Sequence, residues 1–137
     1  MANGGWHDTD EEWRRVEAPL IRLDPYLDQF AHKYGLSFTK NHKNQPERSI
    51  AWGDNVRCLI QIYMVDQSAP AFNLWVCASQ DREGSRFWKQ ETPCKEMQGP
   101  EMEAGLPDLL EEGKQKLDHW SLHPELLEFA TKLMSSR

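Results

Sequence analysis

Hydrophobic residues recur along this chain with two different periods. Near the N-terminus they stand three and four residues apart, at Trp13, Val16, Leu20, Leu23, Leu27, Phe30 and Tyr34, which is the spacing of one helix face. Two prolines interrupt this stretch and exclude one continuous helix. Within residues 9–34 we therefore predict a first helix over about residues 9–18 and a second helix that Asp24 caps and that ends before Gly35.

From residue 36 the period changes to two, which is typical of strands with one buried face. The alternating segments within residues 36–92 are residues 36–40, 48–52, 56–64, 72–78 and 86–92. The connections between them are short and contain Asn, Asp, Gly or Pro, the residues that favour turns. Short turns join antiparallel neighbours, so the pattern predicts a five-stranded antiparallel meander.

Helical spacing returns in the C-terminal part of the chain. Residues 93–105 contain two prolines and two glycines, and we predict a loop there. Two further helices are expected within residues 106–135, separated by an interruption at residues 121–124. A block of strands between N-terminal and C-terminal helices predicts an α+β fold, with the helices packed on one face of the sheet.

The length of 137 residues favours a single domain. Residues 1–8 are polar and contain two glycines, so we interpret them as a flexible N-terminal tail and residues 9–137 as the domain. The chain has six tryptophans, and each carries more apolar surface than an aliphatic residue. Trp13 and Trp120 are expected in the helical core, and Trp6 is expected to be exposed.

Charge and cysteine content indicate the setting in which the protein works. The sequence shows no membrane-spanning run and no secretion signal. Three cysteines without CxxC spacing favour reduced thiols in the cytoplasm. Cys58 and Cys77 lie in strand patterns, whereas Cys94 lies in the predicted loop and is expected to be the most reactive. A net charge of −6, concentrated at the two ends of the chain, argues against nucleic acid or an anionic membrane as partner.

The strongest candidate for a functional surface is the second face of the predicted sheet. On the two central strands it carries Arg57, Leu59, Gln61, Tyr63, Asn73, Trp75, Cys77 and Ser79, which we call the polar–aromatic face. A solvated sheet face usually carries Thr, Lys and Glu, whereas aromatic rings among a few polar groups are typical of pockets and interface hot spots. A turn at residues 66–70 places Tyr63 opposite Asn73 and Gln61 opposite Trp75, with Arg57 near Ser79.

The fifth strand extends this face in one of two ways. It presents either Arg86, Trp88 and Gln90 or Phe87, Lys89 and Glu91, because the preceding turn does not define the register. The candidate residues for binding a partner or ligand are Arg57, Gln61, Tyr63, Asn73, Trp75, Arg86 and Trp88. Two other interpretations of the face remain: a second packing layer, in which a terminal helix or loop covers the rings, and a dimer interface.

Support for metal or catalytic chemistry is weak. His119 and His123 are four residues apart, but Pro124 disfavours a helix through His123, and a third ligand is missing. Lys40, His42, Lys43 and Arg48 form a weakly basic cluster that suits an anion site or, more simply, a solvated loop. The chain contains no GxSxG, P-loop, GxGxxG or HExxH motif. We assign no catalytic residue, metal or cofactor.

Two functional hypotheses of different kinds follow. The first is a small acidic cytoplasmic protein that binds another protein, or a second copy of itself, without catalysis. The alternative is a small-molecule site, with or without catalysis, between the sheet and a terminal helix. There Arg57 or Arg86 would bind an anionic group, and Trp75 and Tyr63 would stack on the ligand. The exposure of Trp52, Trp75 and Trp88 decides whether the strand tryptophans belong to the core or to a binding surface.

Overall fold

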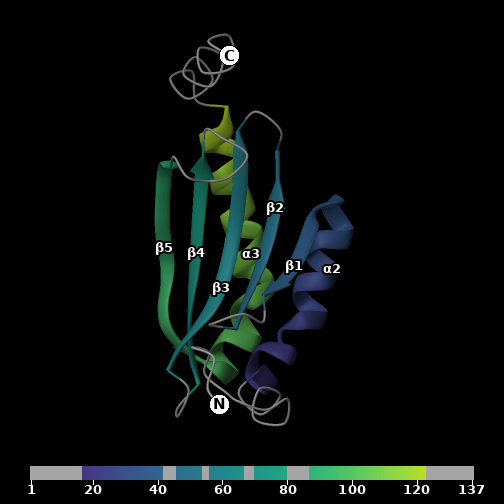
Figure 1. The fold of residues 1–137 in the computed structure, drawn as a ribbon, viewed down its shortest axis with the longest axis vertical. Coiled ribbons are helices and arrows are strands. Elements are labelled where there is room, and N and C mark those ends of the chain that lie inside the picture. Colours follow the sequence, from purple (N-terminus) through teal and green to yellow (C-terminus); the bar gives the residue numbers. More distant parts are fainter. Residues whose placement is uncertain (1–16, 42–45, 54–55, 67–69, 80–86, 123–137) are drawn as a thin grey trace, which may run out of the picture.

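Five strands form one antiparallel sheet in the order β1-β2-β3-β4-β5 (Figure 1). They are β1 (Ser37–Asn41), β2 (Glu47–Trp52), β3 (Arg57–Asp66), β4 (Ala71–Ser79) and β5 (Phe87–Gln98). The computed structural model of the chain describes residues 17–41, 46–53, 56–66, 70–79 and 87–122. Every strand pairs with the next one along the chain, so the five-stranded antiparallel meander predicted from the two-residue period is confirmed.

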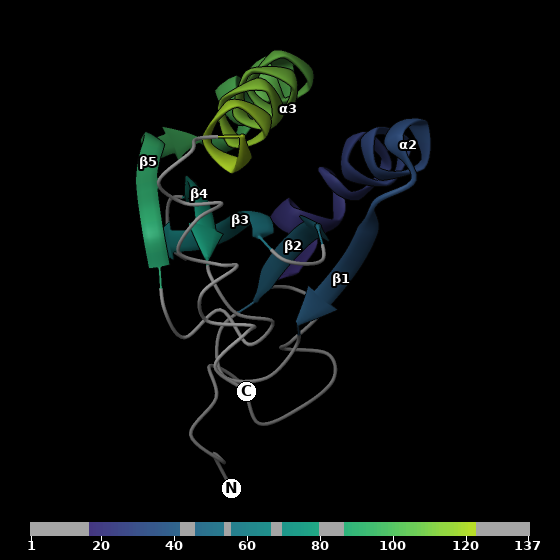
Figure 2. The same ribbon diagram turned by 90° about the horizontal axis from the view of Figure 1, so that it is seen from above.

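In the described part of the chain, the helices α2 (Asp24–Tyr34) and α3 (Gly99–Ser121) cover one face of this sheet (Figure 2). The longer helix, α3, packs over β3, β4 and β5, whereas α2 contacts β1 and α3. Alternate strand residues fill the space beneath the helices, and all are buried: Ile50, Cys58, Ile60, Ile62, Met64, Phe72, Leu74, Val76 and Ala78. The fold is therefore α+β, and we call this side of the sheet the helix-covered face.

The N-terminal helical region differs from the prediction in where it breaks. Residues 17–21 are helical, residues 22–23 form a turn, and α2 then begins at Asp24. The break thus comes later than residue 18, and residues 9–16 lie outside the described part of the chain. Gly35 ends α2 with φ of +66°, the left-handed conformation expected of glycine there. The predicted cap at Asp24 is wrong, because Leu23 occupies the N-cap position and Asp24 is the first residue of the helix. The Asp24 carboxylate accepts a hydrogen bond from Arg48 in β2.

The loop predicted for residues 93–105 is wrong. β5 continues to Gln98, and Cys94 and Met97 pair with Leu74 and Phe72 of β4. The register shifts between these pairs, and Glu96 adopts a φ of +51°. Bulges of this kind insert extra residues into a strand without ending it. Pro93, a residue type that usually favours turns, therefore lies within a bent edge strand.

The helix α3 begins seven residues earlier than predicted. Pro100 occupies its first turn, where a proline loses no intrahelical hydrogen bond, and Met102 extends the buried stripe of the helix. Pro107, which stands near the predicted start at residue 106, therefore lies inside the helix. The second predicted C-terminal helix, after residue 123, and the tail of residues 1–8 lie outside the described residues. Within the described residues, no helix combines the length and apolar character needed to cross a membrane.

The tryptophans divide between the two faces of the sheet. Trp120 of α3 is buried in the core, as predicted. Trp52 packs against the core from β2, and its indole Nε1 donates to Asp118 Oδ1 of α3 at 3.2 Å. Trp75 belongs to the opposite face and is half-buried. Trp6, Trp13 and the side chain of Trp88 lie outside the described part of the structure.

Candidate functional site

The polar–aromatic face forms with the register that the sequence predicted. Tyr63 pairs with Asn73 and Gln61 with Trp75 across β3 and β4. All four side chains are half-buried, and both described helices lie on the other side of the sheet (Figure 2). Neither α2 nor α3 provides the second packing layer that was an alternative interpretation of this face.

Hydrogen bonds connect the polar tips of this face across three strands. The Asn73 amide donates from Nδ2 to the Tyr63 hydroxyl at 3.1 Å, and its Oδ1 accepts from the backbone N–H of Glu96 at 2.7 Å. The Trp75 Nε1 donates to Gln90 Oε1 at 3.0 Å. Asn73 thus links β3 to the bulged part of β5, and both aromatic rings are held at their polar ends.

A shallow hollow of about 360 Å³ lies on this face. Four strands line it, with Glu47 from β2, Gln61 and Tyr63 from β3, Trp75 from β4 and Thr92 from β5. We call it the tyrosine–tryptophan hollow. Glu47 is the register partner of Tyr63, so a carboxylate-bearing residue stands directly beside the tyrosine. Among the described residues of the lining, Glu47 is the only acidic one.

Sequence reasoning missed Glu47 and Thr92. We expected β2 to begin at residue 48, which left Glu47 in a loop, although it continues the alternation of Ser49 and Ala51 on the same strand. Thr92 follows Gln90 by two residues on β5 and shares its face, so it lines the hollow together with Trp75. The alternation was present in the sequence of both strands, whereas the choice of face on β5 depends on its contacts with α3.

The remaining candidates do not join the hollow. Arg57 pairs with Ser79, six residues along β3 from Tyr63 and therefore about 20 Å away. Arg86 lies outside the described residues, as does the side chain of Trp88. Gln90 belongs to the polar–aromatic face through its bond with Trp75. Lys89 and Glu91 instead face α3.

Contacts with α3 establish the orientation of β5. The Lys89 ammonium lies 4.8 Å from the centre of the Trp120 ring, and Glu91 pairs with Lys116 at 3.1 Å. Of the two predicted orientations of β5, the structure thus has the one that places Gln90 on the polar–aromatic face. Lys89 and Glu91 lie on the helix-covered face.

All three cysteines are free and buried. Burial raises the pKa of Cys58 to about 12 and that of Cys77 to about 11, and it also raises the pKa of Cys94. The expectation that Cys94 lies in a loop is wrong, since it lies in β5 and is 5% exposed. That Cys94 is the most reactive of the three thiols stays a prediction. A thiol is nucleophilic only as its thiolate, so these environments oppose cysteine chemistry.

Arg48 is a buried structural cation and not part of an exposed basic cluster. Its side chain is 1% exposed; its Nε donates to Asp24 Oδ1 at 2.7 Å and its Nη2 to Glu17 Oε2 at 2.5 Å. Burial opposes the charge, but the hydrogen bonds of Asp24 and Glu17 outweigh it and raise the pKa of Arg48. Lys40 also pairs with Asp24, at 3.4 Å. Arg48 and Lys40, the members of the basic cluster that the structure describes, thus both form ion pairs with carboxylates.

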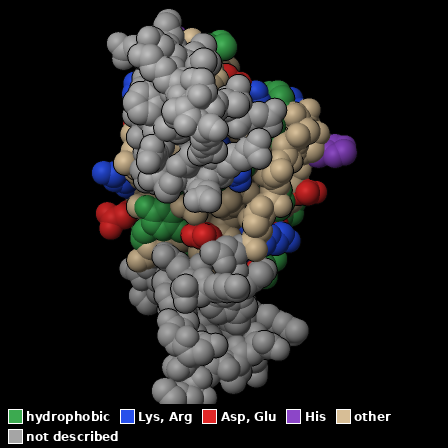
Figure 3. All heavy atoms as spheres, turned by 45° about the horizontal axis from the view of Figure 1, so that its top comes forward, with side chains coloured by type: hydrophobic (Ala, Val, Ile, Leu, Met, Phe, Trp, Pro, Cys, Tyr) green, Lys and Arg blue, Asp and Glu red, His purple; other side chains and the backbone are tan. Residues whose placement is uncertain are grey.

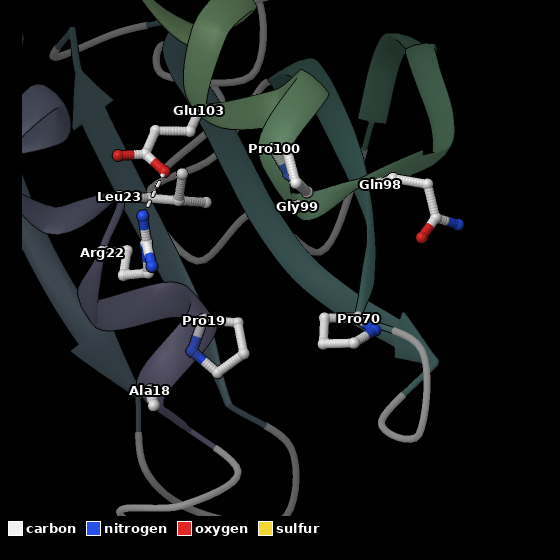
Figure 4. A pocket seen from close by; sticks show the side chains of 9 residues that line it. All are labelled: Ala18, Pro19, Arg22, Leu23, Pro70, Gln98, Gly99, Pro100 and Glu103. Atoms are coloured by element: carbon white, nitrogen blue, oxygen red, sulfur yellow. Dashed lines mark ion pairs between the residues drawn. The ribbon is translucent and has the colours of Figure 1, made fainter.

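A second cavity opens where the N-terminal helical segment meets the start of α3 (Figure 4). Its volume is about 350 Å³, and its lining residues are Ala18, Pro19, Arg22, Leu23, Pro70, Gln98, Gly99, Pro100 and Glu103. Three prolines and Leu23 make its walls mainly apolar. Arg22 and Glu103 form an ion pair of 3.3 Å that joins the two helical elements at the cavity.

Charges elsewhere on the described surface are mixed. On the side of the molecule drawn in Figure 3, basic and acidic side chains are interspersed and not grouped by sign. Among the residues that the structure describes, no group of three or more His, Cys, Asp or Glu side chains is placed to hold a metal ion.

Comparisons with known proteins identify no relative of this chain. No protein-family model matches it, and neither the curated protein sequences nor the solved structures contain a significant match.

Proposed function

We propose that this protein is a non-catalytic module that binds another protein through its polar–aromatic face. The observation that carries the proposal is a pair of aromatic side chains, Tyr63 and Trp75, held by hydrogen bonds beside a hollow on the face opposite the helices. Tyrosine and tryptophan are enriched among residues that contribute most to protein–protein binding. This surface has the composition of such a contact.

The hydrogen bonds also reduce the cost of association. A partner that immobilises free side chains loses about 0.5–1.5 kcal/mol for each one. Here Asn73 and Gln90 already restrain the polar ends of both rings. These bonds also occupy part of the hydrogen-bonding capacity of the Asn73 and Gln90 amides. Fewer polar groups are therefore left unpaired when a partner covers the face.

Site-specific photo-crosslinking tests this proposal. A photoreactive phenylalanine analogue replaces Gln61 on the polar–aromatic face, and the control carries it at Gln29, which is exposed on α2. In extract from the source cells, we expect a discrete protein adduct at position 61 and none at position 29. Excess wild-type protein should abolish the adduct, whereas excess Trp75→Ala protein should not. Equal labelling at both positions would refute the proposal, and an adduct only with a second copy of the chain would assign the face to a dimer.

The apolar cavity near α3 supports a second candidate function, the binding of a small molecule. Its volume of about 350 Å³ lies within the range of small-molecule sites, which are mostly apolar with a few polar groups. This location differs from the one expected from the sequence, in which Arg57 or Arg86 would bind an anionic group beside Trp75 and Tyr63.

Thermal stability in the presence of metabolites tests this second function. A ligand at 100 times its Kd stabilises the protein by about 2.7 kcal/mol, so binding should raise the melting temperature. Ala18→Phe should fill the cavity and remove that increase, while Trp75→Ala should leave it intact. A stabilising ligand that ignores Ala18→Phe would exclude this cavity as its site.

A further inference from the structure

The tyrosine–tryptophan hollow combines two aromatic rings with one carboxylate. Tyr63 and Glu47 are direct neighbours across β2 and β3, and Trp75 lies opposite Gln61 on the next strand. The described residues that line the hollow include no Lys, Arg or His, and its other described members are Gln61 and Thr92. The nearest arginine on β3 is Arg57, six residues further along the strand, so a cation entering the hollow meets no adjacent positive charge on this strand.

Aromatic rings and carboxylates both attract cations. A Lys ammonium or Arg guanidinium over the face of Trp or Tyr gains about 0.5–1 kcal/mol at an exposed site and about 2 kcal/mol or more when desolvated. The polar ends of both rings are already engaged, by Asn73 and by Gln90. The aromatic surfaces, with Glu47 beside them, are therefore the parts of this site that can select a ligand by charge.

From this juxtaposition we propose that the hollow receives a lysine or arginine side chain from a basic segment of the partner protein. The inference rests on the proposed function and specifies its partner. Glu47 supplies the ion pair, Tyr63 and Trp75 supply the aromatic walls, and Gln61 and Thr92 supply hydrogen-bonding groups at the edge.

The charge and shape of the protein favour a basic segment over a free cation. The chain carries a net charge of −6, which attracts basic partners at low ionic strength. The hollow is shallow and spans four strands, so a ligand limited to its interior would bury little surface. A side chain carried on an extended segment also contacts the flat strands around the hollow, in the way that interface anchors are surrounded by weaker contacts.

Peptide binding to the intact protein tests the inference. The probe is a fluorescein-labelled decapeptide with four lysines separated by Gly and Ser, and its counterpart carries glutamates in place of the lysines. Binding is followed by fluorescence anisotropy. Separately, the Trp75 indole N–H signal in nitrogen–proton NMR spectra, assigned with Trp75→Phe, reports whether the peptide reaches the hollow.

We expect the basic peptide to bind and the acidic one not to. Glu47→Gln should weaken binding about 5- to 10-fold, and Trp75→Leu by about 2- to 30-fold, which is the range of a cation–π contact. Asp108→Asn is the matched control, because Asp108 is exposed on α3 and its replacement changes net charge equally. This control should weaken binding less than 2-fold.

Competition distinguishes occupation of the hollow from general attraction. Tetramethylammonium chloride should displace the peptide more effectively than sodium chloride at the same ionic strength, and it should shift the Trp75 signal by itself. Equal displacement by the two salts, or equal effects of Glu47→Gln and Asp108→Asn, would overturn the inference. The crosslink at position 61 could still form in that case, so the protein-binding proposal would survive separately. If the crosslink at position 61 is lost while peptide binding still depends on Glu47, the hollow binds basic peptides. Only the proposal that this face binds another protein is then refuted.

Discussion

On the helix-covered face, Ile60, Ile62 and Leu74 are at most 1% exposed, whereas the neighbouring Gln61, Tyr63 and Trp75 on the polar–aromatic face are half-buried. The same strands supply both sets, because successive side chains of a strand point to opposite sides. The strands of the first set pack against α3. The second set lines a hollow, where Tyr63 and Trp75 make hydrogen bonds through their polar ends. This comparison teaches that stability and recognition are assigned to opposite faces, so each can be altered with little effect on the other.

Two arginines on opposite faces provide the largest test. Arg48→Met removes the cation between Glu17 and Asp24 and leaves two carboxylates without it inside the protein. Breaking a buried ion pair in this way costs about 3–5 kcal/mol, a large part of a typical stability of about 5–15 kcal/mol. Arg57→Met, on the polar–aromatic face, should cost less than about 1 kcal/mol. Urea unfolding measures both changes.

A combined variant controls for the buried charges. Glu17→Leu and Asp24→Leu together with Arg48→Met replace the whole buried network by apolar side chains, which is often neutral or stabilising. It should recover most of the stability that Arg48→Met loses. Equal losses for Arg48→Met and Arg57→Met would contradict the assignment of stability to the helix-covered face.

Two aliphatic neighbours on β3 give the next largest test. Ile60→Ala removes a side chain that is 1% exposed, and truncation of such core residues costs about 2–5 kcal/mol. Leu59→Ala removes a half-buried side chain on the opposite face and should cost about 1 kcal/mol. The free energies of unfolding in urea provide the comparison; similar losses would mean that the polar–aromatic face is packed as a second core.

Two thiols provide the smallest test. Cys58 and Cys77 lie on opposite faces but are equally hidden, at 1% exposed. Burial raises the pKa of both, to about 12 and about 11, and Arg57 opposes the rise at Cys77. In a Cys94→Ser protein at pH 8, both should react with a disulfide reagent at least about 100-fold more slowly than in the unfolded chain. As the pH rises, Cys77 should react first, and earlier reaction of Cys58 would contradict this order.

The same shifts give a direction for stability against pH. A thiol whose pKa is raised by folding stabilises the protein fully below its unfolded pKa. That contribution is lost as the pH rises from about 9, the ordinary thiol value, towards about 11 for Cys77 and about 12 for Cys58. Replacing both cysteines by alanine should therefore flatten the alkaline decline of the free energy of unfolding.

A part of the site could be predicted from the sequence when it depends on neighbouring residues, and not when it depends on contacts between distant segments. Alternation and a short turn were sufficient to pair Tyr63 with Asn73 and Gln61 with Trp75, because a register slip of one residue would expose every apolar side chain of the strand. Glu47 was missed because β2 begins one residue earlier than expected. Glu96, whose backbone N–H bonds to Asn73, gave no signal, since its role requires the bulged pairing of β5 with β4.

Arg48 and Arg57 illustrate the same limit within one sheet. Each lies in a strand that the alternation of apolar residues predicted. We expected Arg48 to be an exposed member of the basic cluster. Its parity with Ile50 placed it on the helix-covered face, but only the position of the N-terminal helical segment brought Glu17 and Asp24 to it. Burial of a charge is decided by partners that are distant in sequence, because it is tolerated only when they are present.

The sequence by itself determined the order of helices and strands, the antiparallel pairing of β3 with β4 and the separation of apolar from polar–aromatic side chains. These depend on period, turns and burial of alternate residues, which are local properties. The tertiary structure alone decided that β5 is bulged, that α3 begins at Gly99, that Arg48 is paired inside the protein and that four strands enclose a hollow with Glu47. These features arise from contacts between segments far apart in the chain. The energies of those contacts outweigh the loop or exposed positions that the local sequence favours for Pro93, Cys94 and Arg48.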